Sequence, residues 1–260
     1  MLAEYQKRRL YFAVGGITVT LNFAHRGFSG QFPENTMLAF EKAVEAGADG
    51  IELDVQFSKD GELVIMHDET LNRTAGVDGF VKDYTLEQLK AMDVSGKWGD
   101  RYGSMEIPTL REYFEHFKDL PVITNIELKT GIFPYPGIEK RTLEMIREYE
   151  LENKVIISSF NHYSCLKIKE LDEKIPCGLL EESWIVGAGK YGRKLGMDFL
   201  HPAYPMVTES YVQDAADHGL KVNTWTVNDW DSMEYFTKIG VNAIIGNFPD
   251  LAEKALNPYR

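Results

Sequence analysis

The feature that most constrains the fold of this chain is the alternation of strand-like and helix-like segments from about residue 19 onward. Short apolar runs, rich in β-branched residues, are followed by segments whose apolar residues recur at helical spacing. Eight segments are predicted as parallel strands: 19–24, 51–57, 122–128, 155–159, 178–180, 199–201, 222–227 and 243–245. Strands that alternate with crossover helices favour a (β/α)₈ barrel. A doubly wound open sheet is the alternative, although it usually has fewer repeats.

Two stretches depart from this alternation. Lys59-Asp60-Gly61 is typical of a turn, so residues 63–66 are predicted to run back as a hairpin strand. Residues 68–108 are rich in Gly, Asp and Lys and show no sustained periodicity, apart from a short predicted helix at 86–92. The regular helices predicted on either side are 34–46 and 109–117.

The N-terminus combines a basic patch with an apolar run, which is faintly similar to a signal peptide. Lys7-Arg8-Arg9 is followed by apolar residues 10–24, but Gly15-Gly16 interrupts the run, which is too short to span a bilayer. We therefore predict a short leader or hairpin at 1–18 and one catalytic domain at 19–260. Since no other segment is a transmembrane candidate, no stable membrane anchor is expected.

Charge and cysteine content limit the function further. The net charge is -12 and the pI about 5.0, so the basic stripe expected of a nucleic-acid binder is missing. A small anionic substrate remains possible, because a local cation can reverse the field in one pocket. Cys165 and Cys177 are too few for a disulfide framework in a chain of 260 residues. Both are predicted to be reduced, which points to the cytoplasm.

Acidic side chains lie toward the predicted C-terminal ends of the strands, where barrels of this kind carry their active sites. Glu52 and Asp54 are two residues apart on one strand and so point to the same face, and Glu127 repeats the theme on the next parallel strand. Three converging carboxylates suit one hard divalent cation, Mg²⁺ or Ca²⁺, better than Zn²⁺. The alternative is that they only form ion pairs with Arg26 and Lys129.

Two histidines are the candidate proton carriers. His25 ends the first strand and His67 ends the hairpin strand, and histidine exchanges protons readily near neutral pH. Arg26 and Lys129 supply positive charge for phosphate oxygens. Together with a metal ion, this set favours phosphoester cleavage. Residues 33–36 are interpreted more simply, as the polar start of the first helix, with Glu34 as a residue that could also brace the site.

In combination, five motifs resemble those of the glycerophosphodiester phosphodiesterase family. They are His25-Arg26-Gly27, Pro33-Glu34-Asn35-Thr36, Glu52-Leu53-Asp54-Val55, His67-Asp68 and Glu127-Leu128-Lys129. The resemblance runs from about residue 21 through nearly the whole chain. It implies a TIM barrel with a small insertion after the second strand unit, at about 68–108. It also implies hydrolysis of glycerophosphodiesters to glycerol 3-phosphate and an alcohol.

The resemblance also implies roles for single residues. His25 and His67 would be the acid/base pair, and Glu52, Asp54 and Glu127 would hold the metal. Arg26 and Lys129 would contact the phosphate of the substrate. Phe160 and Trp225 would form an apolar wall beside the glycerol. Where the family usually has Thr-Asp near the last strand, this chain has Gly246-Asn247, which puts in doubt any role at that end of the barrel but not the catalytic set.

Two other functions stay open at this point. One is a lysophospholipase D-like or phosphoinositide-like phosphodiesterase on the same barrel, which would need an apolar surface; Phe28, Phe32 and Trp98 could contribute to it. The other is a non-catalytic binding protein, which the intact set of site residues disfavours. The head group of the substrate and the oligomeric state cannot be predicted from the sequence.

Overall fold

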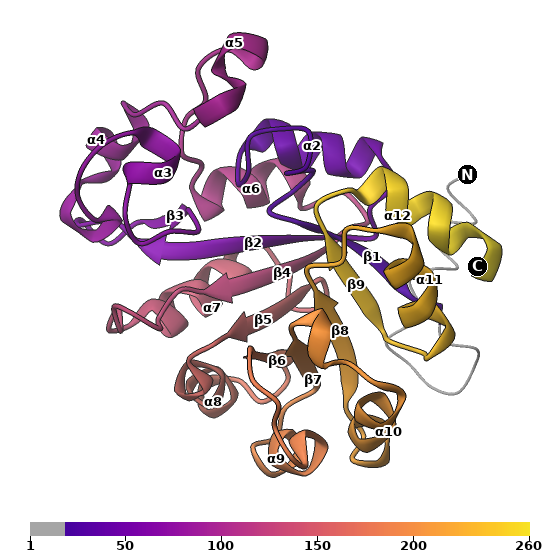
Figure 1. Ribbon diagram of the computed structural model, residues 1–260. Helices are drawn as coiled ribbons and strands as arrows, with labels where there is room; N and C mark the ends of the chain where they lie inside the picture. Colours follow the sequence, from indigo (N-terminus) through magenta and orange to yellow (C-terminus); the bar gives the residue numbers. More distant parts are fainter. Residues whose placement is uncertain (1–18) are drawn as a thin grey trace.

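A closed barrel of eight parallel strands forms the centre of the protein, in a computed structural model that describes residues 19–260 (Figure 1). The leader or hairpin predicted at 1–18 lies outside the described residues. The barrel strands are β1 (Leu21–His25), β2 (Gly50–Phe57), β4 (Ile123–Leu128), β5 (Val155–Ser159), β6 (Cys177–Glu181), β7 (Phe199–Pro202), β8 (Lys221–Trp225) and β9 (Ala243–Gly246). Each strand pairs with its neighbour in chain order, and β1 pairs with both β9 and β2, which closes the barrel. The predicted TIM-barrel fold is therefore confirmed.

Helices follow the strands and cover the outside of the barrel (Figure 1). They are α2 (Met37–Glu45), α6 (Leu110–Phe117), α7 (Ile138–Glu148), α8 (His162–Leu171), α9 (Ala188–Lys194), α10 (Glu209–Asp217), α11 (Trp230–Lys238) and α12 (Pro249–Leu256). Short 3₁₀ turns lie at η3 (Tyr204–Met206) and η4 (Asn257–Tyr259). The first helix begins at Met37 rather than at residue 34, because Thr36 is its N-cap and accepts a hydrogen bond from the backbone N–H of Ala39.

The alternation of side chains along β2 places apolar residues and carboxylates on opposite faces of the strand. In β2, Ile51, Leu53 and Val55 are fully buried in the apolar layer between barrel and helices. Glu52 and Asp54 take the opposite face, toward the barrel interior. This is the arrangement that the sequence pattern predicted. It buries two carboxylates, which costs free energy unless they are paired or bind a cation.

The hairpin strand β3 (Leu63–Ile65) determines where His67 lies. It runs antiparallel to β2, and Val55 pairs with Ile65 on one edge and with Leu128 of β4 on the other. Because β4 occupies one edge of β2, β3 must lie on the edge that β1 shares. The residues after β3 are thereby carried to the mouth of the barrel beside the end of β1.

The insertion between β3 and α6 is better ordered than its composition indicated. It contains α3 (Asn72–Ala75), η1 (Val81–Asp83), α4 (Leu86–Lys90), η2 (Gly96–Trp98) and α5 (Gly99–Tyr102). Its apolar residues are spread singly along the sequence, yet they gather with β3 in a second small core: Val64, Met66, Leu71, Val81, Leu89, Val94 and Ile107. The absence of periodicity over 68–108 thus conceals a packed subdomain. Among residues 19–260, no helix has the length and apolar character needed to cross a membrane.

Candidate active site

A cavity of about 380 Å³ opens at the C-terminal ends of the barrel strands, within the range of about 300–1,000 Å³ typical of small-molecule sites. Its lining comprises His25, Arg26, Glu52, His67, Asn125, Glu127, Lys129, Ser158, Phe160, Leu180, Glu182, Trp225 and Ile245. Eight of the nine site residues predicted from the sequence are in this set. The ninth, Asp54, is only 1% exposed and lies beneath the surface of the cavity wall.

Three carboxylates converge at one end of the cavity. Glu52, Asp54 and Glu127 each offer an oxygen atom within 4.8 Å of the others, and all three are buried. Burial, together with the charges of Asp54 and Glu127, raises the pKa of Glu52 well above its usual value. The protein alone therefore does not neutralise this cluster.

Two basic residues form ion pairs within this cluster but do not balance the charge of its three carboxylates. Lys129 Nζ lies 2.9 Å from Glu127 and 3.9 Å from Asp54, and Arg26 Nε lies 3.6 Å from Asp54. The backbone N–H of Arg26 donates to Glu52 at 3.0 Å. Within residues 19–260, no group makes a hydrogen bond with the buried Asp54 Oδ1. Two cations face three carboxylates, and one carboxylate oxygen receives no hydrogen bond from the described residues. This arrangement argues against simple ion pairing and fits a site for a hard divalent cation.

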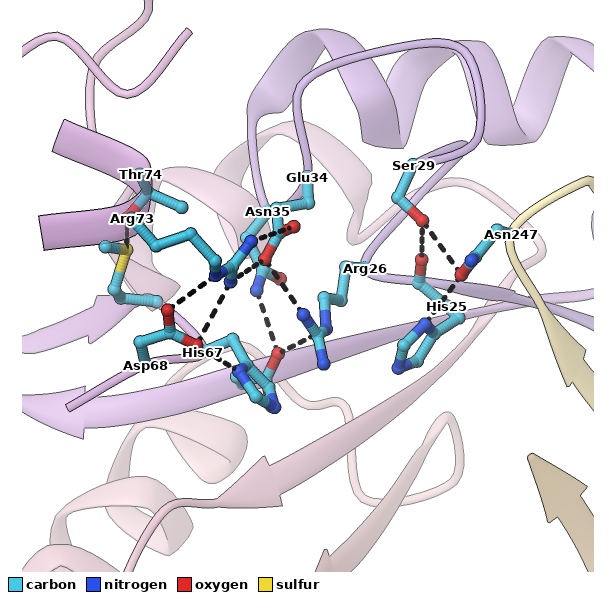
Figure 2. A network of polar contacts seen from close by, with 12 residues as sticks. His25, Arg26, Ser29, Glu34, Asn35, His67, Asp68, Arg73, Thr74 and Asn247 are labelled. Carbon is cyan, nitrogen blue, oxygen red and sulfur yellow. Dashed lines mark hydrogen bonds and ion pairs between the residues drawn. The ribbon is translucent and has the colours of Figure 1, made fainter. Parts of the chain in front are cut away.

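The segment before α2 does more than start the helix. Thr36 caps α2, but Asn35 donates from Nδ2 to Asp54 at 2.8 Å, and Glu34 accepts from Arg26 Nη1 at 2.9 Å (Figure 2). Helix-start chemistry therefore describes Thr36, Glu34 braces the site as the sequence interpretation allowed, and the contact of Asn35 with Asp54 was not predicted. The side chains of Glu34 and Asn35 fix Arg26 and Asp54.

His25 is held by Asn247, the residue that follows β9. Its Nδ1 lies 2.7 Å from Asn247 Oδ1, and Ser29 Oγ donates to the same oxygen at 3.1 Å (Figure 2). Because an amide oxygen only accepts, Nδ1 carries the proton and Nε2 is left as the acceptor. Burial and the nearby Arg26 lower the pKa of His25 to about 4. The departure at Gly246-Asn247 put a role for this end of the barrel in doubt, and the structure places Asn247 in direct contact with His25.

His67 is held in the same way but by a charged partner. Its Nδ1 lies 2.7 Å from Asp68 Oδ1, which leaves Nε2 free (Figure 2). Asp68 in turn accepts two hydrogen bonds from Arg73, a residue that the sequence interpretation missed. Arg73 belongs to none of the five motifs; the signal that could have found it is its position five residues after Asp68, at the start of the insertion.

The loop after β1 is shaped by close packing rather than by flexibility. Gly27 has φ +74°, and a Cβ atom placed there would lie 2.7 Å from the backbone carbon of Ala39. Arg26 itself has φ 56°. Glycine is needed at this point so that the loop can press against α2, which turns the backbone N–H of Arg26 toward Glu52.

The other end of the cavity is apolar. Phe160 and Trp225 meet edge to face with ring centroids 5.5 Å apart, and Leu180 and Ile245 complete the wall. Trp225 Nε1 donates to the carbonyl of His201 at 2.8 Å, which fixes the indole ring. A ligand in this cavity would therefore have a charged end at the carboxylates and a less polar end against the aromatic pair.

This geometry matches a family that the sequence comparisons identify independently. The family model described as "Glycerophosphoryl diester phosphodiesterase family" matches residues 25–251. The chain belongs to this family. The predicted family, and with it the prediction of a phosphodiesterase enzyme, is confirmed.

Individual relatives agree. A glycerophosphodiester phosphodiesterase of Caldanaerobacter subterraneus subsp. tengcongensis is 45% identical over 231 residues, which is 89% of this chain and 95% of that protein. One of Bacillus altitudinis is 40% identical, over 91% of this chain and 98% of that protein. Among solved structures, an Oleispira antarctica phosphodiesterase in complex with the product sn-glycerol-3-phosphate superposes with a TM-score of 0.83 at 30% identity. That match covers 90% of this chain and 96% of the other.

Proposed function

We propose that this member of the family hydrolyses glycerophosphodiesters to sn-glycerol 3-phosphate and an alcohol, with the help of one bound divalent cation. The observation that carries the proposal is one cavity that joins a buried carboxylate cluster to two histidines, each fixed through Nδ1. The product bound by the Oleispira antarctica relative supports the glycerol phosphate half of the substrate.

Glu52, Asp54 and Glu127 would hold the cation, Mg²⁺ or Ca²⁺, as the buried and unpartnered Asp54 Oδ1 favours. When bound, such an ion offsets negative charge on the phosphoryl oxygens. Arg26 and Lys129 line the same wall and would contact the remaining phosphate oxygens, Arg26 through its planar guanidinium. The aromatic pair Phe160 and Trp225 would lie against the glycerol carbons.

The two histidines have partners of different charge, and this supports different roles. Asn247 is neutral and Arg26 is adjacent, so His25 is neutral near pH 7 and its Nε2 would accept the proton of the nucleophile. Asp68 is a carboxylate and accepts from His67 Nδ1, so we assign to His67 the donation of a proton to the leaving alkoxide. The bond from phosphorus to that alkoxide oxygen breaks as the new P–O bond forms.

The nucleophile is either water or the neighbouring glycerol hydroxyl, which would give a cyclic phosphate first. Analysis of the products of one turnover separates these routes, because only the second yields cyclic glycerol phosphate as an early product. Cytoplasmic location stays a prediction from the two free, buried cysteines.

One observation favours a second candidate substrate, a lysophospholipid. Large apolar side chains are exposed in the segments that follow β4, β5 and β6, on connecting loops and in the first turn of α8: Ile132 at 67%, Tyr163 at 81%, Trp184 at 69% and Val186 at 101%. The same segments also contribute Phe160 and Glu182 to the lining of the cavity. They could contact an acyl chain that extends out of it.

The proposal is tested by measuring sn-glycerol 3-phosphate released from glycerophosphocholine, glycerophosphoethanolamine and glycerophosphoglycerol, with a long-chain lysophosphatidylcholine for comparison. We expect the water-soluble diesters to be cleaved, and His25→Ala and His67→Ala each to lose about 10²- to 10⁴-fold in rate. Near-full activity of both variants would sink the histidine mechanism. Faster release of choline from the lysolipid than of sn-glycerol 3-phosphate from any diester would favour the second candidate.

A further inference from the structure

Arg73 lies on α3 of the insertion, outside the lining of the cavity, and contacts two carboxylates at once. Its Nε and Nη2 donate to the two oxygens of Asp68, at 2.6 and 3.0 Å. Its Nη1 and Nη2 donate to the two oxygens of Glu34, at 2.8 and 2.7 Å. One guanidinium therefore makes two bidentate pairs, with carboxylates that come from separate segments of the chain (Figure 2).

Each of these carboxylates also holds a side chain of the cavity. Asp68 Oδ1 accepts from His67 Nδ1 at 2.7 Å, and Glu34 Oε1 accepts from Arg26 Nη1 at 2.9 Å. Arg73 Nη2 contacts these same two oxygens. Two chains of contacts thus begin at one nitrogen of Arg73, and they end at a candidate proton donor and at a candidate phosphate ligand.

The charges of this network need the guanidinium. The side chains of Asp68 and Glu34 are only 22% and 23% exposed to solvent. The side chain of Arg73, which contacts both, is 49% exposed. Although burial opposes it, hydrogen bonds from His67 and Arg73 lower the pKa of Asp68 below its usual range. Without Arg73, two neighbouring carboxylates would repel each other and turn toward solvent.

We propose that Arg73 is a positioning residue: it holds Asp68 against His67 and Glu34 against Arg26, so that the insertion sets the geometry of the reaction. This inference rests on the proposed function, because it depends on the roles of His67 and Arg26 given above. Arg73 acts through its two carboxylates and touches no reacting atom.

Arginine has a geometric reason to be at this position. A lysine would keep the charge, but one ammonium cannot form two bidentate pairs on two planar carboxylates. Arg73→Lys should therefore retain part of the effect, and Arg73→Gln should lose it. Arg111→Gln is a matched control, because Arg111 also makes a two-nitrogen contact to one carboxylate, that of Glu148, but on helices α6 and α7 at the side of the barrel.

Steady-state kinetics give the first readout. We expect Arg73→Gln to lower kcat/KM by about 10- to 100-fold, as is usual when a residue that orients an active-site side chain is lost. Arg73→Lys should lie between that variant and the wild type, and Arg111→Gln should stay within about twofold of the wild type. A full rate for Arg73→Gln would overturn the proposal.

Combining substitutions shows whether Arg73 acts through Asp68. If it does, Arg73→Gln should lower kcat less in the Asp68→Asn background than in the wild type, because only the path through Glu34 to Arg26 remains. The same substitution added to Glu34→Gln should still lower kcat, since the path to His67 remains. Independent, multiplicative effects of Arg73→Gln and Asp68→Asn on kcat would contradict this path.

A third readout needs no activity. In metal-free protein, side-chain ¹⁵N NMR of His67 should show the Nδ1-protonated tautomer in the wild type and in Arg111→Gln, and a mixture of tautomers in Arg73→Gln. An inactive wild type with this pattern would refute the proposed function and leave the positioning role standing. An active wild type, with unchanged tautomer and rate in Arg73→Gln, would refute only the role of Arg73.

Discussion

Glu52 should destabilise the metal-free protein, so its replacement by glutamine should raise the free energy of unfolding. The carboxylate oxygens of the cluster lie within 4.8 Å of one another. At an effective dielectric constant of about 20, two like charges at that distance repel by about 3 kcal/mol. Attraction to Arg26 and its backbone N–H offsets part of this repulsion. We therefore expect metal-free Glu52→Gln to be more stable than the wild type by about 2 kcal/mol at pH 7.

The pH dependence follows from the raised pKa of Glu52, which is caused by burial and by Asp54 and Glu127. A carboxyl whose pKa is higher in the folded than in the unfolded state binds its proton more tightly when folded. Stability is therefore lost as pH rises above the unfolded value of about 4.3, and the loss is complete above the folded pKa. The advantage of Glu52→Gln should be full at pH well above that folded pKa and should vanish toward pH 4.

Urea unfolding in the presence of EDTA measures the effect. Glu173→Gln is the control, since Glu173 is exposed and its replacement removes the same charge. Added Mg²⁺ or Ca²⁺ should stabilise the wild type and should stabilise Glu52→Gln much less. If metal-free Glu52→Gln proves less stable than the wild type at pH 7, the account of the cluster as an unneutralised cation site is refuted.

Two further substitutions test parts of the site. Asn247→Asp places a carboxylate beside His25 Nδ1, so it should raise the pKa of His25 from about 4. The acid limb of the pH profile of kcat/KM should then move to higher pH. An acid limb that does not move would contradict the assignment of His25 as the base. Gly27→Ala should lower the free energy of unfolding by more than about 2 kcal/mol, because positive φ and the backbone of Ala39 both oppose a Cβ atom. Gly61→Ala is the control, because Gly61 has φ +84° and no described atom lies within 4 Å of an added Cβ atom; it should lower the free energy of unfolding by only about 1 kcal/mol. Equal losses of unfolding free energy for the two variants in urea would show that the contact with Ala39 does not matter.

Local pattern was enough to predict the barrel and most of the carboxylate site. The alternation of Ile51, Leu53 and Val55 with Glu52 and Asp54 reports directly which face of a strand is buried. Parallel strands end at the same side of a barrel, so residues at different strand ends could be expected to meet. These inferences need only the period of the strand and the order of elements.

The connections between side chains could not be predicted in the same way. Asn247 meets His25 across 222 residues of sequence, and Arg73 meets Glu34 across 39. Such pairs depend on how loops pack after the strands are placed. His201 shows that a position at the end of a predicted strand is not sufficient: it is fully buried and lies outside the cavity lining. Its partner is Asn223, 3.0 Å away, and burial lowers its pKa to about 3.

The insertion escaped prediction for a different reason. Leu71, Val81 and Leu89 are spaced too irregularly to indicate a helix or a strand, but they pack together with β3. That core fixes α3, and α3 carries Arg73 to the two carboxylates. The segment that looked least structured in the sequence thus supplies Arg73, which contacts the carboxylate that holds His67.

The proposed mechanism depends most on a divalent cation held by Glu52, Asp54 and Glu127. The direct measurement is the rate of sn-glycerol 3-phosphate release from glycerophosphoethanolamine by protein that has been dialysed against EDTA, before and after Mg²⁺ or Ca²⁺ is restored. We predict that release stops on chelation and returns with one of these ions. Release at the original rate after chelation would contradict the metal site and the mechanism built around it.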